Sequence, residues 1–156
     1  QGARGFPDAG DSRHPMKYRM GTALLSLAGV FVSAYLWMFK HGYIGSLACG
    51  TGGCATVQFS EYSKFLGVDV ALLGFVGYAL LLGMAMLGLQ PAWQARREPA
   101  RAALLFSAGG VLFAGYLTWL ELFVIHAICR WCVASAVLIV LVFLLQLLDH
   151  RRLARG

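Results

Sequence analysis

The sequence CRWC at residues 129–132 continues without a break into the apolar run VASAVLIVLVFLL at residues 133–145. This run predicts a long helix with a C-x-x-C pair at its start. The spacing i, i+3 places Cys129 and Cys132 on one face of the first turn, close enough to form a disulfide. The unpaired backbone N–H groups and the positive dipole end of that turn favour a thiolate over a thiol. We therefore expect a reactive dithiol at the edge of a membrane.

The composition extends this expectation to the whole chain. Of the 156 residues, 59% are hydrophobic and 13% are charged, and the mean hydropathy is +0.68. These values are typical of an integral membrane protein. Because about 20 apolar residues span a bilayer as a helix, four spans with short connections nearly fill the length. The sequence predicts an all-α integral membrane protein, a four-transmembrane-helix bundle, with no separate soluble domain.

Four apolar segments are long enough to be these spans. We expect them at residues 20–39, 68–89, 102–125 and 128–148, within a membrane domain that covers residues 20–148. The polar residues 1–19 are expected to form a disordered basic tail, and residues 149–156 a second basic tail. The apolar run at 20–39 is longer than the core of a signal peptide, so we expect a retained helix.

The longest connection, residues 40–67, carries the other two cysteines. Four residues, three of them glycine, separate Cys49 from Cys54. After Cys54, apolar residues recur near positions 55, 59, 62, 65 and 66, which predicts a short amphipathic helix lying in the interface plane. The sequence thus places a Cys-containing, Gly-rich loop and a horizontal helix over the outward face of the bundle.

The basic residues indicate an orientation. The N-terminal tail, the turn at residues 90–101 and the C-terminal tail carry ten of the 13 Lys and Arg residues, whereas Lys40, Lys64 and Arg130 fall on the other side. By the positive-inside rule, both termini are cytoplasmic, as in a bacterial inner-membrane protein. All four cysteines then face the periplasm, where disulfides persist. The basic sequence pI near 9.5 follows from this topology, and no pattern indicates nucleic-acid binding.

Three interpretations fit four cysteines in two close pairs. Two structural disulfides could staple a scaffold that binds a partner or lipid, although such short loops constrain the unfolded chain little. A zinc site fits less well, because the second pair lies on a helix on the oxidising side, and we expect no metal. A thiol–disulfide relay is favoured, because a flexible pair facing a fixed pair suits in-line exchange. A lipid-soluble quinone is the acceptor that suits an apolar bundle.

The order of these motifs resembles a known family. Cys49 and Cys54, then Ser60 six residues later, then the C-x-x-C that opens the last helix are similar to the vitamin K epoxide reductase family. The run from Cys54 to Gly74 most resembles its bacterial quinone-coupled, disulfide-forming branch. The resemblance covers about residues 20–148. Oxidases of the DsbB type also have four helices, but they resemble the reverse order, with the C-x-x-C pair first.

The resemblance implies a role for each cysteine. Cys49 exchanges with the dithiol of a partner, and Cys54 resolves that mixed disulfide. Cys54 then passes electrons to Cys129 through a transient bridge between the two sulfurs. Cys132 lies deepest and reduces the quinone. Ser60 matches a serine of the family that helps to hold the loop over the site.

The quinone pocket is expected around Cys132, Ala136 and Trp131. Trp131, like Trp37 and Trp119, is interpreted first as an interface or packing residue. Ala136 stands where vertebrate members have a tyrosine, and the loop cysteines lie closer together than in those enzymes. Both departures favour disulfide formation linked to a quinone of the ubiquinone, menaquinone or vitamin K type over the alternative, vitamin K epoxide or quinone reduction itself. Many bacterial relatives carry a fused thioredoxin-like domain, so the expected partner here is a separate soluble protein resembling DsbA or thioredoxin.

Three further residues are candidates for supporting roles. His126, three residues before Cys129, could donate a proton or depress a thiol pKa, or it could simply be interfacial. Glu121 is ionisable within a predicted span, which makes it a functional candidate, although it could instead reach the interface or pair with Arg130. Asp69 is placed to cap the second span.

Overall fold

The computed structural model of the protein describes residues 13–49, 53–94 and 96–155. Its long helices are α1 (Arg13–Lys40), α3 (Val70–Leu89), α4 (Arg97–Leu120) and α5 (Arg130–Arg155). Between α1 and α3 lie a short helix α2 (Gly53–Gln58), a 3-10 turn η1 (Glu61–Ser63) and the paired strands β1 (Lys64–Phe65) and β2 (Val68–Asp69). A π-helical turn, η2 (Glu121–Ile125), continues α4. The predicted all-α architecture is confirmed.

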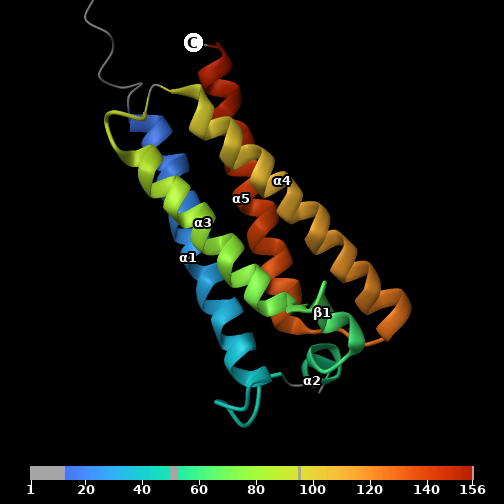
Figure 1. Ribbon diagram of the computed structural model, residues 1–156. Coiled ribbons are helices and arrows are strands. Elements are labelled where there is room, and N and C mark those ends of the chain that lie inside the picture. The colour runs from blue at the N-terminus through green and yellow to red at the C-terminus, as the bar shows by residue number, and fades with distance from the viewer. Residues whose placement is uncertain (1–12, 50–52, 95, 156) are drawn as a thin grey trace, which may run out of the picture.

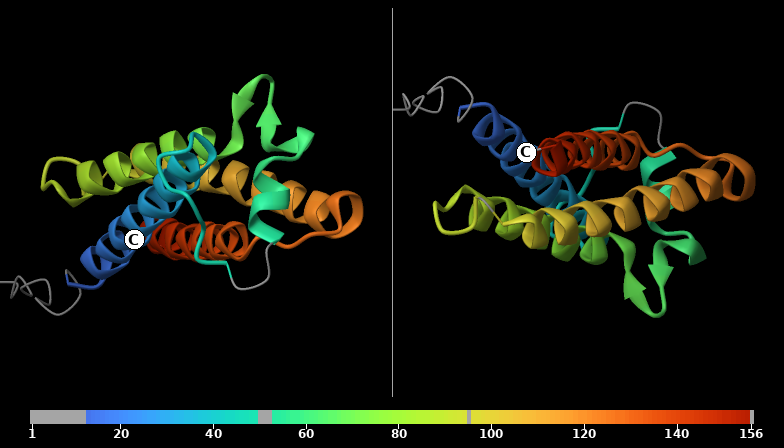
Figure 2. Two further views of the ribbon diagram at one scale, coloured as in Figure 1. Left: turned by 90° about the horizontal axis from the view of Figure 1, so that it is seen from below. Right: turned by 90° about the horizontal axis from the view of Figure 1, so that it is seen from above.

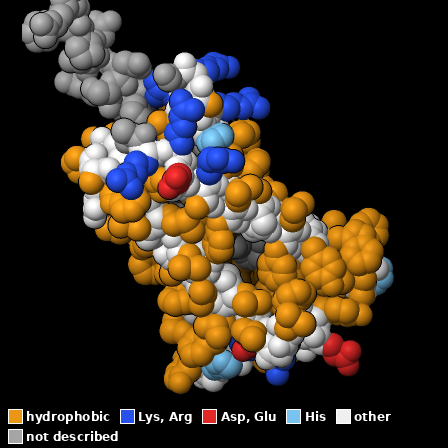
Figure 3. Space-filling model, turned by 45° about the horizontal axis from the view of Figure 1, so that its top comes forward, with side chains coloured by type: hydrophobic (Ala, Val, Ile, Leu, Met, Phe, Trp, Pro, Cys, Tyr) orange, Lys and Arg blue, Asp and Glu red, His pale blue; other side chains and the backbone are white. Residues whose placement is uncertain are grey.

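Four helical segments have the length and hydropathy to cross a bilayer. They are Met16–Lys40, Val70–Leu89, Arg97–Ile125 and Arg130–Arg155. Large apolar side chains on them, such as Leu24, Phe31 and Leu112, are exposed. In Figure 3, hydrophobic side chains cover the middle of the visible face, and Lys and Arg gather at one end. Because apolar surface of this extent is stable in lipid and not in water, the chain is a multi-pass membrane protein.

The helices leave an open side in the bundle. α1 packs along both α3 and α5, and α5 also packs along α4, whereas α3 and α4 make fewer contacts with each other. Figure 1 shows α3 and α4 separating toward the end of the bundle where α2 and the hairpin lie. The views along the bundle in Figure 2 place these short elements beside the helix ends. The fold therefore has one end covered by short elements, and α3 and α4 diverge toward that end.

A close helix approach fixes the middle of the bundle. A Cβ atom on Gly29 of α1 would lie 2.3 Å from the ring of Tyr78 on α3. The Tyr78 hydroxyl donates a hydrogen bond to the carbonyl oxygen of Ser135 on α5 at 2.6 Å. Only a residue without a side chain fits between α1 and that ring. This arrangement holds α1, α3 and α5 in one register.

The helices extend beyond the predicted spans into the predicted tails. α1 begins at Arg13, so residues 13–19 are helical, whereas residues 1–12 lie outside the described part. At the opposite end of the chain, α5 continues to Arg155. Arg19 and Asp149 are both buried, and the Arg19 Nε lies 3.0 Å from an oxygen of Asp149. Because these charges neutralise each other, both helices continue past their apolar segments.

The predicted amphipathic helix is shorter than expected. It ends at Gln58, and the chain then turns through η1 into the antiparallel pair β1 and β2. Leu66 and Gly67 join the strands, with φ values of 54° and 84°. A two-residue turn with positive φ matches the twist of a hairpin. The apolar positions after residue 59 suit a helix by spacing alone, but in the structure Tyr62 lies in η1, and Phe65 and Leu66 lie in the exposed hairpin.

Candidate active site

The two cysteine pairs are in different redox states. Cys49 and Cys54 form a disulfide, whereas Cys129 and Cys132 are free thiols. Cys54 is fully buried on α2, and Cys49 lies on the segment that follows α1. The predicted glycine-rich loop between them, residues 50–52, lies outside the described residues. Cys129 immediately precedes α5, and Cys132 lies in its first turn. The structure therefore contains one disulfide and one dithiol.

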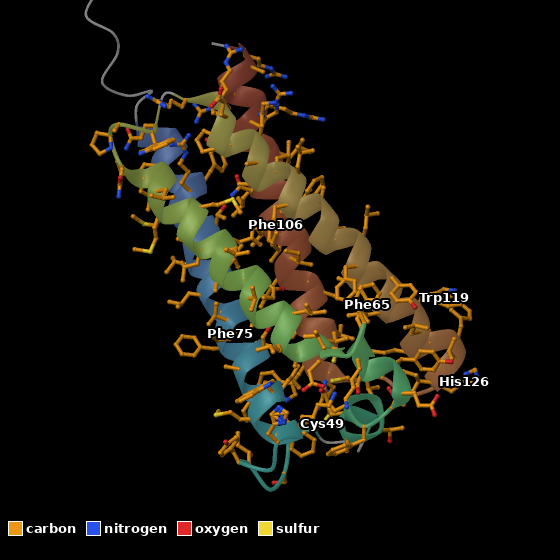
Figure 4. The ribbon with its side chains drawn as sticks, viewed as in Figure 1. Cys49, Phe65, Phe75, Phe106, Trp119 and His126 are labelled. Atoms are coloured by element: carbon orange, nitrogen blue, oxygen red, sulfur yellow. A yellow bond between two sulfur atoms is a disulfide. The ribbon has the colours of Figure 1, made fainter. Side chains whose placement is uncertain are left out.

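All four cysteines meet in one cluster of packed side chains. Cys54 and Cys129 are both completely buried and belong to this cluster, and Cys49 and Cys132 pack against it. The cluster lies at the end of the bundle beside α2, where Figure 4 labels Cys49. Residues that are more than 70 positions apart in the sequence thus become neighbours. This proximity is the geometric requirement for exchange between the two pairs.

Hydrogen bonds distinguish Cys129 from Cys132. Cys129 lies between the last two spanning helices, and its sulfur accepts from the Cys132 thiol and from the Cys132 backbone N–H, the latter at 3.4 Å. The bond from the thiol, more than that from the backbone, holds the pKa of Cys129 below its ordinary value. In thiol–disulfide exchange, the thiolate is both the nucleophile and the easier leaving group. Cys129 is therefore the more reactive sulfur of this pair.

Glu121 is held beneath the C-x-x-C pair by an unusual turn. It opens η2, and its carbonyl oxygen accepts from the N–H groups of His126 and Ala127. His126 has a φ of 55°, which reverses the chain direction. The Glu121 side chain is therefore brought back toward Cys129, whose N–H donates to its Oε2 at 3.1 Å. Glu121 is only 4% exposed and does not pair with Arg130, which is exposed.

A cavity of about 450 Å³ lies between the four long helices and reaches Cys132. Its walls are largely apolar, and its few polar groups include Gln58, Glu121 and Tyr78. The Gln58 side-chain amide donates to the Cys132 sulfur at 3.5 Å. Ala136 also lines the cavity. A mainly apolar pocket of this size with a few convergent polar groups suits a small, lipid-soluble ring compound, so these residues fit a quinone.

The other predicted site residues lie farther from this cavity. The Ser60 hydroxyl donates to the Val57 carbonyl at 2.7 Å and so closes the turn after α2. His126 is exposed at the end of η2, and Figure 4 places it at the outer edge of the same end of the bundle as Cys49. Trp131 is half-buried, with its ring 5.0 Å from that of Tyr35. It packs against the cysteine cluster and is not among the described residues that line the cavity.

Sequence reasoning missed two polar residues of the cavity, Gln58 and Tyr78. Gln58 lies four residues after Cys54, which puts both on one face of α2. Tyr78 is a polar side chain in the middle of an apolar span. The spacing of Gln58 from Cys54 and the polar residue within an apolar span are both visible in the sequence. Neither shows that the side chain faces a cavity, because that depends on how the helices pack.

The predicted side-chain cap by Asp69 is wrong. Asp69 occupies the N-cap position of α3, but its side chain makes no capping hydrogen bond; its carboxylate lies 2.7 Å from the Nζ of Lys40 and 3.5 Å from the Nε2 of His41. The bond from Lys40 holds the pKa of Asp69 below its ordinary value. Lys40 also donates to the Ser63 hydroxyl at 2.8 Å. The end of α1 is thereby fastened to the hairpin segment that covers the site.

Within residues 13–49, 53–94 and 96–155, no three His, Cys, Asp or Glu side chains are grouped to hold a metal ion.

The sequence was also compared with models of protein families. Residues 21–147 match the model described as the vitamin K epoxide reductase family. The matched region contains both cysteine pairs, the greater part of the four spanning helices and every residue named above that lines the cavity.

Proposed function

This chain belongs to the vitamin K epoxide reductase family, whose members are oxidoreductases, and we propose that it is a quinone-dependent thiol–disulfide oxidoreductase. It reoxidises a soluble periplasmic protein that resembles DsbA or thioredoxin. Electrons pass from the partner's dithiol to Cys49 and Cys54, then to Cys129 and Cys132, and finally to a membrane quinone. Both termini are cytoplasmic, since most basic residues lie at that end of the bundle.

The observation that carries this proposal is the meeting of a disulfide and a dithiol beside an apolar cavity. Cys54 and Cys129 share one buried cluster, and Cys132 lines the cavity. A stapled scaffold predicts two oxidised pairs, whereas here one pair is free. A disulfide beside a dithiol is the combination of groups that each exchange step of a relay requires.

Each exchange step breaks one disulfide and forms another, so the number of disulfides stays the same. A partner thiolate attacks Cys49, which breaks the Cys49–Cys54 bond and releases the Cys54 thiolate. Cys54 then attacks Cys129 in its disulfide with Cys132 and releases the Cys132 thiolate. The partner's second thiol displaces Cys49 and leaves as a disulfide. Cys49 next attacks Cys54, which restores the outer disulfide and leaves the inner pair reduced.

The inner pair then returns to its disulfide as two electrons pass to the quinone in the cavity. The residues of this chain would bind and orient the quinone. The apolar walls exclude water, and Gln58 holds the Cys132 sulfur. A quinone supplies the two-electron acceptor chemistry that no side chain of the site provides. Reduction potentials set the direction, with about 30 mV corresponding to about 1.4 kcal/mol for a two-electron couple.

Quinone reduction by the purified protein in detergent tests the proposal. The donor is a reduced DsbA protein, and the acceptors are ubiquinone, menaquinone and vitamin K. We expect turnover by the wild type and none by Cys132→Ala, which should accumulate the bridge between Cys54 and Cys129. The exposed Ser46→Ala variant is the matched control and should retain turnover.

Three results would contradict the proposal. Normal turnover by Cys132→Ala would show that this sulfur does not reduce the quinone. No turnover by the wild type with any of the three quinones, with both cysteine pairs oxidised throughout, would favour the stapled scaffold. Turnover with vitamin K epoxide in place of a quinone would assign the chain to epoxide reduction.

A further inference from the structure

Glu121 lies where two cavities meet. It lines the 450 Å³ cavity together with Cys132, and it also lines a smaller pocket whose other residues include Ser60 and Ser63. Both serines also line a third pocket, which contains Lys40 at the outward end of α1. The three pockets therefore share lining residues from Lys40, by way of Ser63 and Ser60, to Glu121. Such a series is the arrangement that proton relays use at the edge of a membrane.

The Glu121 carboxyl also contacts both members of the inner pair. It accepts from the backbone N–H of Cys129 at 3.1 Å, and it lies beside the Cys132 thiol at the wall of the cavity. The salt bridges within the described residues join Arg19 or Lys40 or His41 to other carboxylates, and none of them includes Glu121. An intramembrane carboxyl held by the reacting pair, and not by a cation, is a candidate for proton transfer.

The proton count of the reaction calls for such a group. A quinone takes up two electrons and two protons when it becomes a quinol. Hydrogen bonds to the Cys129 sulfur lower the pKa of that thiol, and when Cys129 reacts as a thiolate the inner pair holds one proton, on Cys132. Oxidation of the pair to a disulfide releases two electrons and this one proton. A second proton must come from another group beside the cavity.

We propose that Glu121 is the proton-transfer residue that supplies this second proton and is recharged from the outward face along Ser60 and Ser63. This inference rests on the function proposed above. As the bond between Cys129 and Cys132 forms, the Cys132 proton and the Glu121 proton both pass to the quinone oxygens. Glu121 is left as a carboxylate, and a proton from the outward face restores its acid form.

Glu121→Gln tests this role, because the amide oxygen can still accept from the Cys129 N–H but the side chain carries no transferable proton. The reaction is one turnover of the dithiol form with a short-chain ubiquinone, after reduction by dithiothreitol. We expect quinol formation to slow by about tenfold or more, with a larger solvent deuterium isotope effect. Glu121→Asp, which keeps the acid, should recover part of the rate. Glu98→Gln makes the same change at an exposed carboxyl on the same helix and should react as the wild type.

A second readout needs no quinone. When diamide oxidises the inner pair, the time-resolved infrared difference spectrum of the wild type should contain a transient carboxyl C=O band that marks loss of the Glu121 proton and decays as the outward face restores it. The band should be absent in Glu121→Gln and present in Glu98→Gln. If Glu121→Gln does not fold, the wild-type band and the rate of Glu121→Asp still decide the question.

The outcomes separate this inference from the proposed function. Equal rates for Glu121→Gln and the wild type, or equally slow rates for the Gln and Asp variants with unchanged isotope effects, would overturn the proton role and leave quinone reduction intact. The absence of a carboxyl band would also overturn it. No quinol formation by the wild type would instead reject the proposed function.

Discussion

Gly53 lies directly against the backbone of Ile128: a Cβ atom at position 53 would come within 2.5 Å of the Ile128 carbonyl oxygen. Each of these residues precedes a fully buried cysteine of the site, Cys54 and Cys129. The contact is between main chains, so it sets how closely α2 can approach the start of α5. The absence of a side chain at position 53 therefore lets the Cys54 and Cys129 sulfurs lie in one cluster.

We expect Gly53→Ala to slow electron transfer between the two cysteine pairs. The new methyl group would overlap the Ile128 carbonyl oxygen, so α2 must move away from the start of α5. A shift of about 1 Å can slow a reaction by about a hundredfold. Rapid quenching with an alkylating agent would follow the transient bridge between Cys54 and Cys129. The control is Gly45→Ala, because a Cβ at position 45 meets nothing within 4 Å. Equal rates for both variants would show that the contact does not position the sulfurs.

The ion pair between Asp69 and Lys40 should stabilise the hairpin segment in a pH-dependent manner. The pKa of Asp69 is held below its ordinary value of 3.8, so the folded protein favours the carboxylate. This stabilisation is complete above the ordinary pKa and is lost as the pH falls through the lowered one. We expect Asp69→Asn to lower the free energy of unfolding by about 1–2 kcal/mol at neutral pH.

Thermal unfolding at a series of pH values would measure this contribution. The difference between the wild type and Asp69→Asn should be constant near neutral pH and should narrow as the pH falls below about 4. Glu61→Gln, at an exposed carboxyl in the adjacent turn, serves as the control and should show little difference at any pH. A difference for Asp69→Asn that does not change with pH would contradict an electrostatic origin.

Loss of the buried ion pair between Arg19 and Asp149 should lower the free energy of unfolding more than loss of the pair between Asp69 and Lys40. The Arg19 guanidinium also donates to the carbonyl oxygens of Gly88 and Gln94, so it joins α1, α5 and the end of α3. Asp149→Asn leaves the guanidinium buried without a counter-ion, and we expect a loss of about 3 kcal/mol or more.

Unfolding of the purified protein in detergent would measure that loss. Arg151→Gln removes an exposed charge two residues away and should have little effect. If Asp149→Asn unfolded at the same temperature as this control, the ion pair would not hold this end of the bundle together.

Much of the fold follows from local properties of the chain. Segments of about 20 apolar residues must form helices in lipid, because every backbone N–H and C=O needs a partner there. The cysteine pairs are recognisable from spacing alone. The exact helix ends were not predictable, since the extension of α1 across Arg19 depends on Asp149, a residue 130 positions away. The hairpin after Gln58 was also missed, because its apolar residues fit a helical period equally well.

The candidate site could likewise be predicted only in part. The sequence by itself determined that four cysteines lie in two close pairs and that one pair begins the last membrane helix, because these features depend on neighbours in the chain. Only the tertiary structure decided that Gly53 meets Ile128, that Glu121 turns back to Cys129, and that a cavity opens at Cys132. These relationships join elements that are distant in sequence, and they depend on helix packing and backbone reversal, which no local pattern specifies.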